Sequence, residues 1–261
     1  MVATRTEVAK IGLPGHGRGQ TWGLRGVGQS IFEESVTPKH KLGDRLQLGP
    51  RVFYYARAGA ALVAGSMVSF NVRMNYDDVP VTNHGIGTTE LTVLDDSTGT
   101  AKDAFAEGMV IVHDGTGEGD QYIVKSNAVA AASTNITVTI YEPGLQNAWG
   151  GTTDITLVSS AFYDMKEAGA ATASGAGTSL IAITDDGYYF WLQTYGPAAV
   201  EISAEDDSGA GDAEQAMTIT SGGMLVKATA GDWVCAHSLG TTIDSAETNS
   251  DFGYVWLTCA A

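Results

Sequence analysis

The sequence predicts an all-β protein, with a β-sandwich or barrel-like body and an extended N-terminal arm. Glycine is abundant, with 33 of 261 residues, and only 17% of the residues are charged. Glycine in a helix interior costs up to about 1 kcal/mol relative to alanine, so this composition disfavours long helices. Runs of β-branched and aromatic residues also recur about every 8 to 12 residues, with turn-forming residues between them, as in sandwiches and barrels.

Residues 1–45 contain no sustained apolar period, and we predict that they form the extended arm. Glycines between Pro14 and Gly28 are so dense that ordering this stretch alone would cost too much conformational entropy. We therefore expect the arm to become ordered against a partner, although a plain flexible tail is the alternative. The expected contacts are its basic and aromatic side chains: Arg5, Lys10, Arg18, Trp22, Arg25, Phe32, Lys39 and Lys41.

Residues 46–168 form the first predicted β-rich region. Residues 135–141 alternate with period two, which places Ile136, Val138 and Ile140 on one face of a strand. The apolar runs at 109–113 and 121–125 are joined by a glycine-rich stretch, which indicates a hairpin. The predicted strands are 51–57, 67–74, 90–94, 109–113, 121–125, 135–141 and 154–158.

Residues 169–261 form the second predicted β-rich region, which follows a join rich in Ala, Gly and Ser at 169–178. Residues 186–193 and 251–258 resemble each other because each is a glycine turn that leads into an aromatic strand. The predicted strands are 180–183, 188–194, 200–204, 216–219, 224–228, 232–237 and 252–258.

The strand at 188–194 is aromatic on both faces. Strand alternation places Tyr188 and Phe190 on one side and Tyr189 and Trp191 on the other. Aromatic residues on both faces indicate burial on both, either between layers or at a subunit contact. A stacking platform for sugars or bases is the weaker alternative. The residues expected in this aromatic core or interface are Tyr188, Phe190, Trp191 and Trp256.

Charge is distributed unevenly along the chain. The first 57 residues carry nine Lys/Arg and four Asp/Glu, whereas the remaining 204 carry five and twenty-six. An acidic body repels its own copies, and a basic arm gives each copy a means of holding a neighbour, which favours assembly. The acidic pI of about 4.5 argues against binding of nucleic acid by the body. The absence of an apolar run of 18 residues argues against a membrane span, and the N-terminus has no signal-peptide pattern.

No strong catalytic or metal-binding motif is present, and we expect no enzyme activity, cofactor or metal. The acidic loop 114–120 lacks the EF-hand ligand pattern, so solvated turn acids are the simpler interpretation. Cys235 and His237 are suitable residue types for a thiol nucleophile and would share a strand face, but no third orienting group can be named. Cys235 and Cys259 are either two free thiols or a disulfide.

The chain resembles head decoration (cement) and related virion structural proteins of tailed bacteriophages. The resemblance is carried by the runs Phe53–Gly59, Leu62–Gly65, Tyr188–Gly196 and Phe252–Leu257. The similarity extends over residues 45–261 in composition and strand pattern, without a strict sequence motif. The resemblance implies a non-enzymatic, oligomeric protein on the outer capsid lattice, and it transfers no individual functional residue.

We therefore expect a capsid decoration protein that binds the major capsid protein and copies of itself, but no nucleic acid or membrane. It would reside on the virion surface after assembly in the host cytoplasm, and its arm would add strands or charge contacts to neighbours. The alternatives are another virion component, such as a head fibre, a tail protein or a receptor- or glycan-binding protein, and a thiol-dependent hydrolase.

Overall fold

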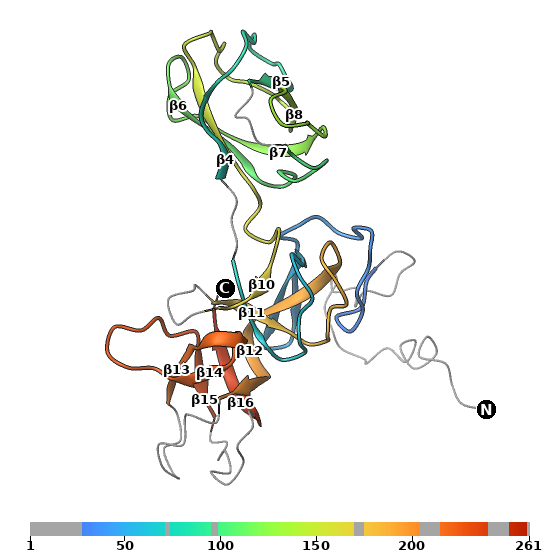
Figure 1. Cartoon of the computed structure of the whole chain (residues 1–261), viewed down its shortest axis with the longest axis vertical. Coiled ribbons are helices and arrows are strands. Elements are labelled where there is room, and N and C mark those ends of the chain that lie inside the picture. The colour runs from blue at the N-terminus through green and yellow to red at the C-terminus, as the bar shows by residue number, and fades with distance from the viewer. Residues whose placement is uncertain are drawn as a thin grey trace, which may run out of the picture. The chain divides into compact units, whose positions relative to one another are not determined.

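The computed structural model describes residues 28–70, 74–94, 99–169, 175–203, 215–239 and 251–259 (Figure 1). Within these ranges every regular element is a β-strand, apart from the 3-10 turn Ser221–Gly223. The predicted all-β class, with barrel-like sheets, is therefore confirmed. The part of the chain that the structure describes also contains no helix long and apolar enough to cross a membrane.

The chain folds into two compact units that do not follow one another in sequence. Unit 1 comprises Met1–His40, Arg45–Val68 and Glu167–Ala261, and unit 2 comprises Lys41–Asp44 and Ser69–Lys166. This division differs from the linear one at 46–168 and 169–261. The predicted strand 67–74 is divided, because β3 (Met67–Ser69) and β4 (Met74–Pro80) belong to different sheets.

Unit 2 is a six-stranded antiparallel barrel. Its sheet order is β4-β9-β6-β7-β8-β5, and the bridge between Val81 and Val93 joins β5 back to the end of β4. The predicted hairpin is confirmed by the pairing of β6 with β7, and the alternation of β8 is confirmed by its three buried aliphatic residues. The further strands of this unit are β5 (Glu90–Val93), β6 (Met109–Asp114), β7 (Gln121–Asn127), β8 (Ile136–Ile140) and β9 (Asp154–Val158).

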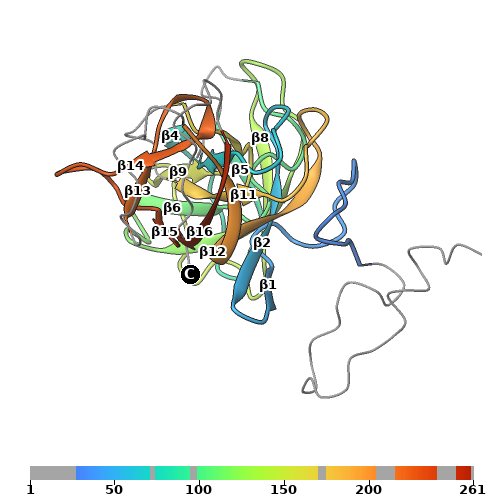
Figure 2. The ribbon, with the colours of Figure 1, turned by 90° about the horizontal axis from the view of Figure 1, so that it is seen from below.

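Unit 1 is organised around one long strand, β12 (Tyr189–Ile202). The first half of β12 pairs with β2 and β11, and its second half pairs with β16 and, at Ile202, with β14. The strands β12, β14, β13, β15 and β16 close on themselves, as Figures 1 and 2 show. The remaining strands are β1 (Arg45–Leu48), β2 (Arg51–Arg57), β10 (Lys166–Glu167), β11 (Gly175–Ser179), β13 (Ala216–Ile219), β14 (Leu225–Lys227), β15 (Ala236–Ser238) and β16 (Asp251–Thr258).

The two strands predicted at 188–194 and 200–204 are parts of the single strand β12. A β-bulge between Gln193 and Tyr195 interrupts its pairing with β2, and Gly196 follows with φ +88°. A Cβ atom at Gly196 would lie 2.4 Å from the carbonyl oxygen of Pro50, so only glycine fits this close approach. The chain therefore bends here without ending the strand, because bulges increase local twist.

Candidate partner-binding surface

Five of the eight predicted arm contacts lie outside the described residues: Arg5, Lys10, Arg18, Trp22 and Arg25. Phe32 and Lys39 are described and exposed, with Phe32 at 54% of its full accessible surface. These two side chains lie on the surface of unit 1 and are therefore available to a partner. Lys41 belongs to unit 2 and already contacts its own chain.

The first part of the described chain is held on unit 1 by Gln29, which is 2% exposed. Its side-chain Nε2 donates to the carbonyl oxygens of Glu33 and Tyr189, both at 2.6 Å. Its Oε1 accepts a hydrogen bond from the Tyr55 hydroxyl at 2.6 Å, and its carbonyl oxygen accepts one from Trp191 Nε1 at 3.0 Å. The predicted arm to residue 45 is thus too long, since Gln29 and the residues after it contact the chain's own body.

Burial around Gln29 changes the acidity of Tyr55. Its side chain is fully buried beside Trp191, and burial raises the pKa of the Tyr55 hydroxyl from 10.0 to about 12. The hydroxyl also accepts a hydrogen bond from the backbone N–H of Lys39 at 3.0 Å, which opposes that rise. Tyr55 therefore remains a neutral donor to Gln29 at physiological pH.

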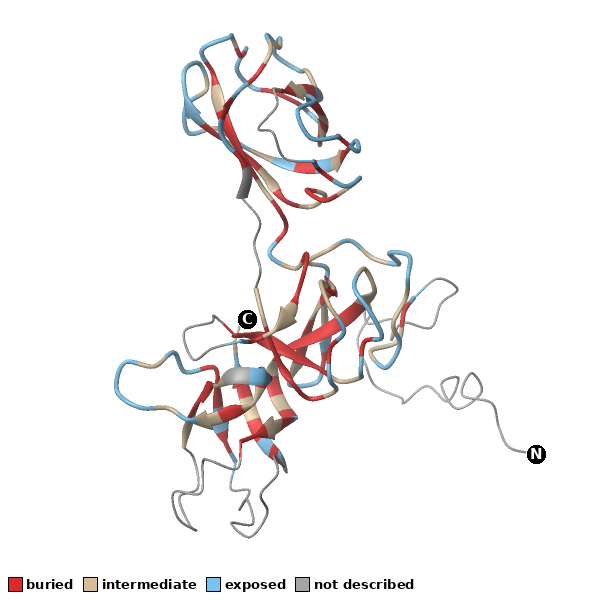
Figure 3. Ribbon diagram, in the orientation of Figure 1, coloured by how far each residue is buried: buried red, intermediate tan, exposed pale blue. Residues whose placement is uncertain are grey.

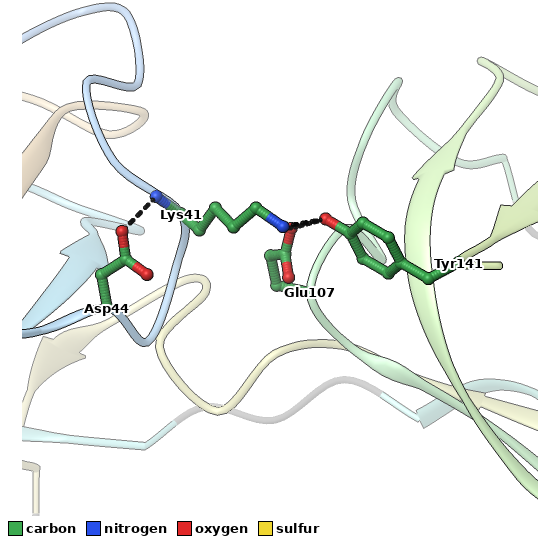
Figure 4. A network of polar contacts seen from close by, with 4 residues as sticks. All are labelled: Lys41, Asp44, Glu107 and Tyr141. Atoms are coloured by element: carbon green, nitrogen blue, oxygen red, sulfur yellow. Dashed lines mark hydrogen bonds and ion pairs between the residues drawn. The ribbon is translucent and has the colours of Figure 1, made fainter.

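Lys41 forms a polar network within unit 2, shown in Figure 4. Its Nζ donates to the Tyr141 hydroxyl and lies 3.5 Å from Glu107 Oε1, while Tyr141 donates to Glu107 at 2.5 Å. The hydrogen bond with Tyr141 raises the pKa of Lys41, and burial together with Glu107 raises the pKa of Tyr141. The backbone N–H of Lys41 also donates to Asp44. The ammonium is engaged within the chain, so it contributes little free charge to a partner.

The predicted aromatic cluster divides into core and surface positions. Phe190 and Trp191 are buried, at 0% and 4% exposed, and Trp191 packs with Phe53 and Tyr55. Tyr188 and Trp256 are half-buried. Trp191 is therefore unsuitable as a stacking platform, whereas Trp256 on β16 remains partly accessible. Figure 3 shows buried and exposed residues along the strands of unit 1.

The outward side of β12 and β16 forms an aromatic surface that the sequence analysis did not identify as a site. We call it the β12–β16 face. Register places Pro197 opposite Trp256, Ala199 opposite Tyr254, and Glu201 opposite Phe252. Its residues are Tyr195, Pro197, Ala199, Glu201, Phe252, Tyr254 and Trp256.

Exposure within this face is high for such large apolar side chains. Phe252 is 57% exposed and Tyr254 50% exposed, while the Tyr195 and Trp256 rings meet edge to face at 5.8 Å. The intervening residues of β16, Val255 and Leu257, are fully buried in the core. The signal in the sequence was therefore the spacing of three aromatic residues at every second position, and contiguous exposed apolar surface of this kind marks interaction sites.

Cys235 and His237 do not form the arrangement expected for a thiol hydrolase. Cys235 precedes β15, is fully buried and directs its Sγ toward the Met217 carbonyl oxygen at 3.6 Å. His237 is exposed, so the expectation that both share one face is wrong. Cys235 and Cys259 are both free thiols, and their mutual hydrogen bond lowers the pKa of Cys235 and raises that of Cys259.

Three carboxylates from separate strands of unit 2 come together. Oxygens of Asp78, Asp114 and Asp154 lie within 4.8 Å of one another, at exposed or partly exposed positions. Sequence reasoning singled out only Asp114, because the other two are brought near it by the pairing of β4, β6 and β9. Asp120, in the same glycine-rich loop, instead accepts hydrogen bonds from Tyr122 and Asn147. Exposed acidic groups of this kind are common without a bound ion, so we assign no metal site.

No protein-family model, curated protein or solved structure matches the chain in comparisons with known proteins.

Proposed function

We propose that this protein is a non-enzymatic virion structural protein that decorates a capsid and stabilises it. The observation that carries the proposal is the charge asymmetry between the N-terminal 57 residues and the rest of the chain. A basic segment attached to an acidic body provides attraction between neighbours where the bodies alone would repel. Repetition of such contacts over a symmetric lattice then gives avidity well beyond a single contact.

The structure supports a narrower version of this role. Because Gln29 and Ser35 are bound to β12 of the same chain, the segment that reaches a partner is residues 1–27. Ser35 and Tyr189 exchange two backbone hydrogen bonds, at 3.0 and 2.8 Å. The proposed contacts to partners, which are the major capsid protein and other copies of this chain, are therefore Arg5, Lys10, Arg18, Trp22 and Arg25, with Phe32 and Lys39 adjoining them on the surface of unit 1.

A charge-reversal experiment tests this role. Phage capsids that lack the decoration protein are mixed with the wild-type chain or with a full-length variant in which Arg5, Lys10, Arg18 and Arg25 are all replaced by Glu. Binding is measured by co-sedimentation at low and high salt. We expect the variant to lose most of its binding and the wild type to weaken as salt rises. A matched control reverses the exposed body lysines Lys102, Lys125 and Lys227 and should bind normally.

Equal binding of heads by the charge-reversed variant and the wild type would refute the proposed role of the N-terminal segment. Failure of the wild-type chain to bind any head would refute the decoration role itself.

The exposed aromatic residues favour one second candidate, a glycan-binding virion protein. Tyr254 and Trp256 could stack on sugar rings, whereas the buried Trp191 could not. Saturable quenching of tryptophan fluorescence by an oligosaccharide, lost in the Trp256→Phe variant, would support this candidate. Unchanged fluorescence over a panel of host-surface sugars would dismiss it.

A further inference from the structure

We propose that the β12–β16 face binds residues 18–27 of a second copy of this chain, with Trp22 as the apolar anchor. This inference rests on the proposed function and deepens it, because it assigns the contact between copies to a particular surface. The contact is heterologous, since each copy offers one segment and one face. It therefore links copies head to tail, either into a ring or into an open row.

The chemistry of the face favours an aromatic and cationic occupant. Phe252 and Tyr254 expose half or more of their surface, and Glu201 lies beside Phe252 in the register. The sequence from 167 to 261, which supplies this part of unit 1, contains thirteen Asp/Glu and a single basic residue, Lys227. A basic segment with an aromatic side chain therefore matches both the exposed rings of the face and the net negative charge of the sequence around it.

Residues 18–27 have the complementary composition. Their sequence, Arg-Gly-Gln-Thr-Trp-Gly-Leu-Arg-Gly-Val, contains Trp22 and two arginines but no acidic residue. Arg18 precedes Trp22 by four positions and Arg25 follows it by three. Trp, Tyr and Arg are the residue types most enriched where interfaces gain their affinity, and arginine also stacks on aromatic rings.

The topology of unit 1 favours a second copy over the chain's own segment. Gln29 is bonded to Tyr55 and Trp191, which pair with each other and share one face of the sheet. Tyr195 pairs with Val52, and strand alternation places Val52 on the opposite face from Tyr55. The bulge after Gln193 thus directs the β12–β16 face away from the side where Gln29 is held. Residues 18–27, which span at most about 35 Å, would have to pass around the sheet edge to reach their own face.

Complementation between two defective full-length variants tests the inference without any capsid. The segment variant carries Trp22→Ala and Arg25→Glu, and the face variant carries Tyr254→Thr, which removes the ring but introduces a β-branched residue that favours a strand. A second face variant, Ala199→Lys, adds charge at an exposed neighbouring position. Circular dichroism and thermal unfolding establish that each variant is folded, and Trp233→Ala is the control, because Trp233 is 62% exposed and lies outside the face.

Sedimentation velocity should show that the wild-type chain and Trp233→Ala associate beyond the dimer as concentration rises. Each defective variant alone should associate at least about tenfold more weakly, as expected for loss of an interface anchor. An equal mixture of the segment variant and either face variant should form a heterodimer and nothing larger, because it retains one intact segment and one intact face per pair.

Three results would overturn the inference: a wild-type chain that remains monomeric, a mixture that fails to form the heterodimer, or equal weakening by Trp233→Ala. The two proposals fail separately. A chain that binds heads without self-association refutes only the copy-to-copy contact, and a chain that self-associates without binding heads refutes only the decoration role.

Discussion

Replacing Gln29 by alanine should destabilise unit 1 by about 3 kcal/mol. The amide makes three short hydrogen bonds, to the carbonyl oxygens of Glu33 and Tyr189 and from the Tyr55 hydroxyl, each at 2.6 Å. A hydrogen bond of this kind contributes about 1 kcal/mol net, and the loss is larger where a buried partner is left unsatisfied. Because Gln29 is 2% exposed, water cannot readily replace the amide in the folded state.

Urea unfolding followed by tryptophan fluorescence is a suitable assay, since Trp191 and Trp256 report on unit 1. The midpoint should fall with little change in slope, because the same surface is exposed on unfolding. Limited trypsin digestion should also cut faster at Lys39, which follows the segment that Gln29 anchors.

Gln47→Ala is the matched control for this experiment. Gln47 is exposed on β1, and its two hydrogen bonds, with Arg45 and Gly49, are both 3.3 Å long. Its loss should change the stability by less than about 0.5 kcal/mol. A Gln29→Ala variant that unfolds at the same urea concentration as Gln47→Ala would refute the claim that this residue holds the first described segment on the body.

Three further changes test other parts of the fold. Because folding raises the pKa of Tyr55, the contribution of this residue to stability is complete below pH 10.0 and is lost as the pH rises toward 12. In urea unfolding over that pH range, the wild type should lose about 2 to 3 kcal/mol of unfolding free energy, and Tyr55→Phe should lose much less. In thermal unfolding, Gly196→Ala should destabilise unit 1 by about 2 kcal/mol or more, because φ is +88° and the added methyl group would clash with Pro50. The control Gly169→Ala should be close to neutral, because no atom lies near a Cβ at that position. Lys41→Met should cost less than about 1 kcal/mol, because the Lys41 side chain is 57% exposed, and a loss above about 2 kcal/mol in calorimetry would show that the network with Glu107 and Tyr141 is stronger than its exposure implies.

Local patterns predicted the strands whose stability comes from alternating or β-branched residues. The bounds of β2, β9 and β13 agree with the sequence prediction, and the hairpin of β6 and β7 was identified from its glycine-rich turn. Such strands carry their own signal, since one face must be apolar and the turn must permit positive φ.

Long-range packing determined what local patterns missed. The strand β11 has the sequence Gly-Ala-Gly-Thr-Ser and was assigned to a join, yet all five residues are buried. Its small side chains allow the neighbouring backbone to approach, since a Cβ at Gly177 would lie 2.2 Å from the carbonyl oxygen of Gln193. Likewise, the true end of the arm is set by the hydrogen bond from Gln29 to the carbonyl oxygen of Tyr189, which lies 160 residues away in the sequence.

The candidate surface was only partly predictable for the same reason. Trp256 was identified as a core or interface residue, but the exposure of Phe252 and Tyr254 depends on their pairing with Ala199 and Glu201. Which face of an aromatic strand is solvent-exposed is set by the neighbouring strands and by the bulge after Gln193, and neither is encoded within residues 251–258 themselves.

The pairing of β10 with β3 has a consequence for how this molecule tolerates change. Residues 69–166 depart from one of these strands and return on the other, and the hydrogen bond from the Ala168 N–H to the Met67 carbonyl oxygen closes the gap at 3.0 Å. The six-stranded barrel is therefore an inserted domain whose two connections to unit 1 lie next to each other. Insertion or exchange of a whole domain is best tolerated at such sites. Another domain can therefore replace residues 69–166 while unit 1 keeps its strand order.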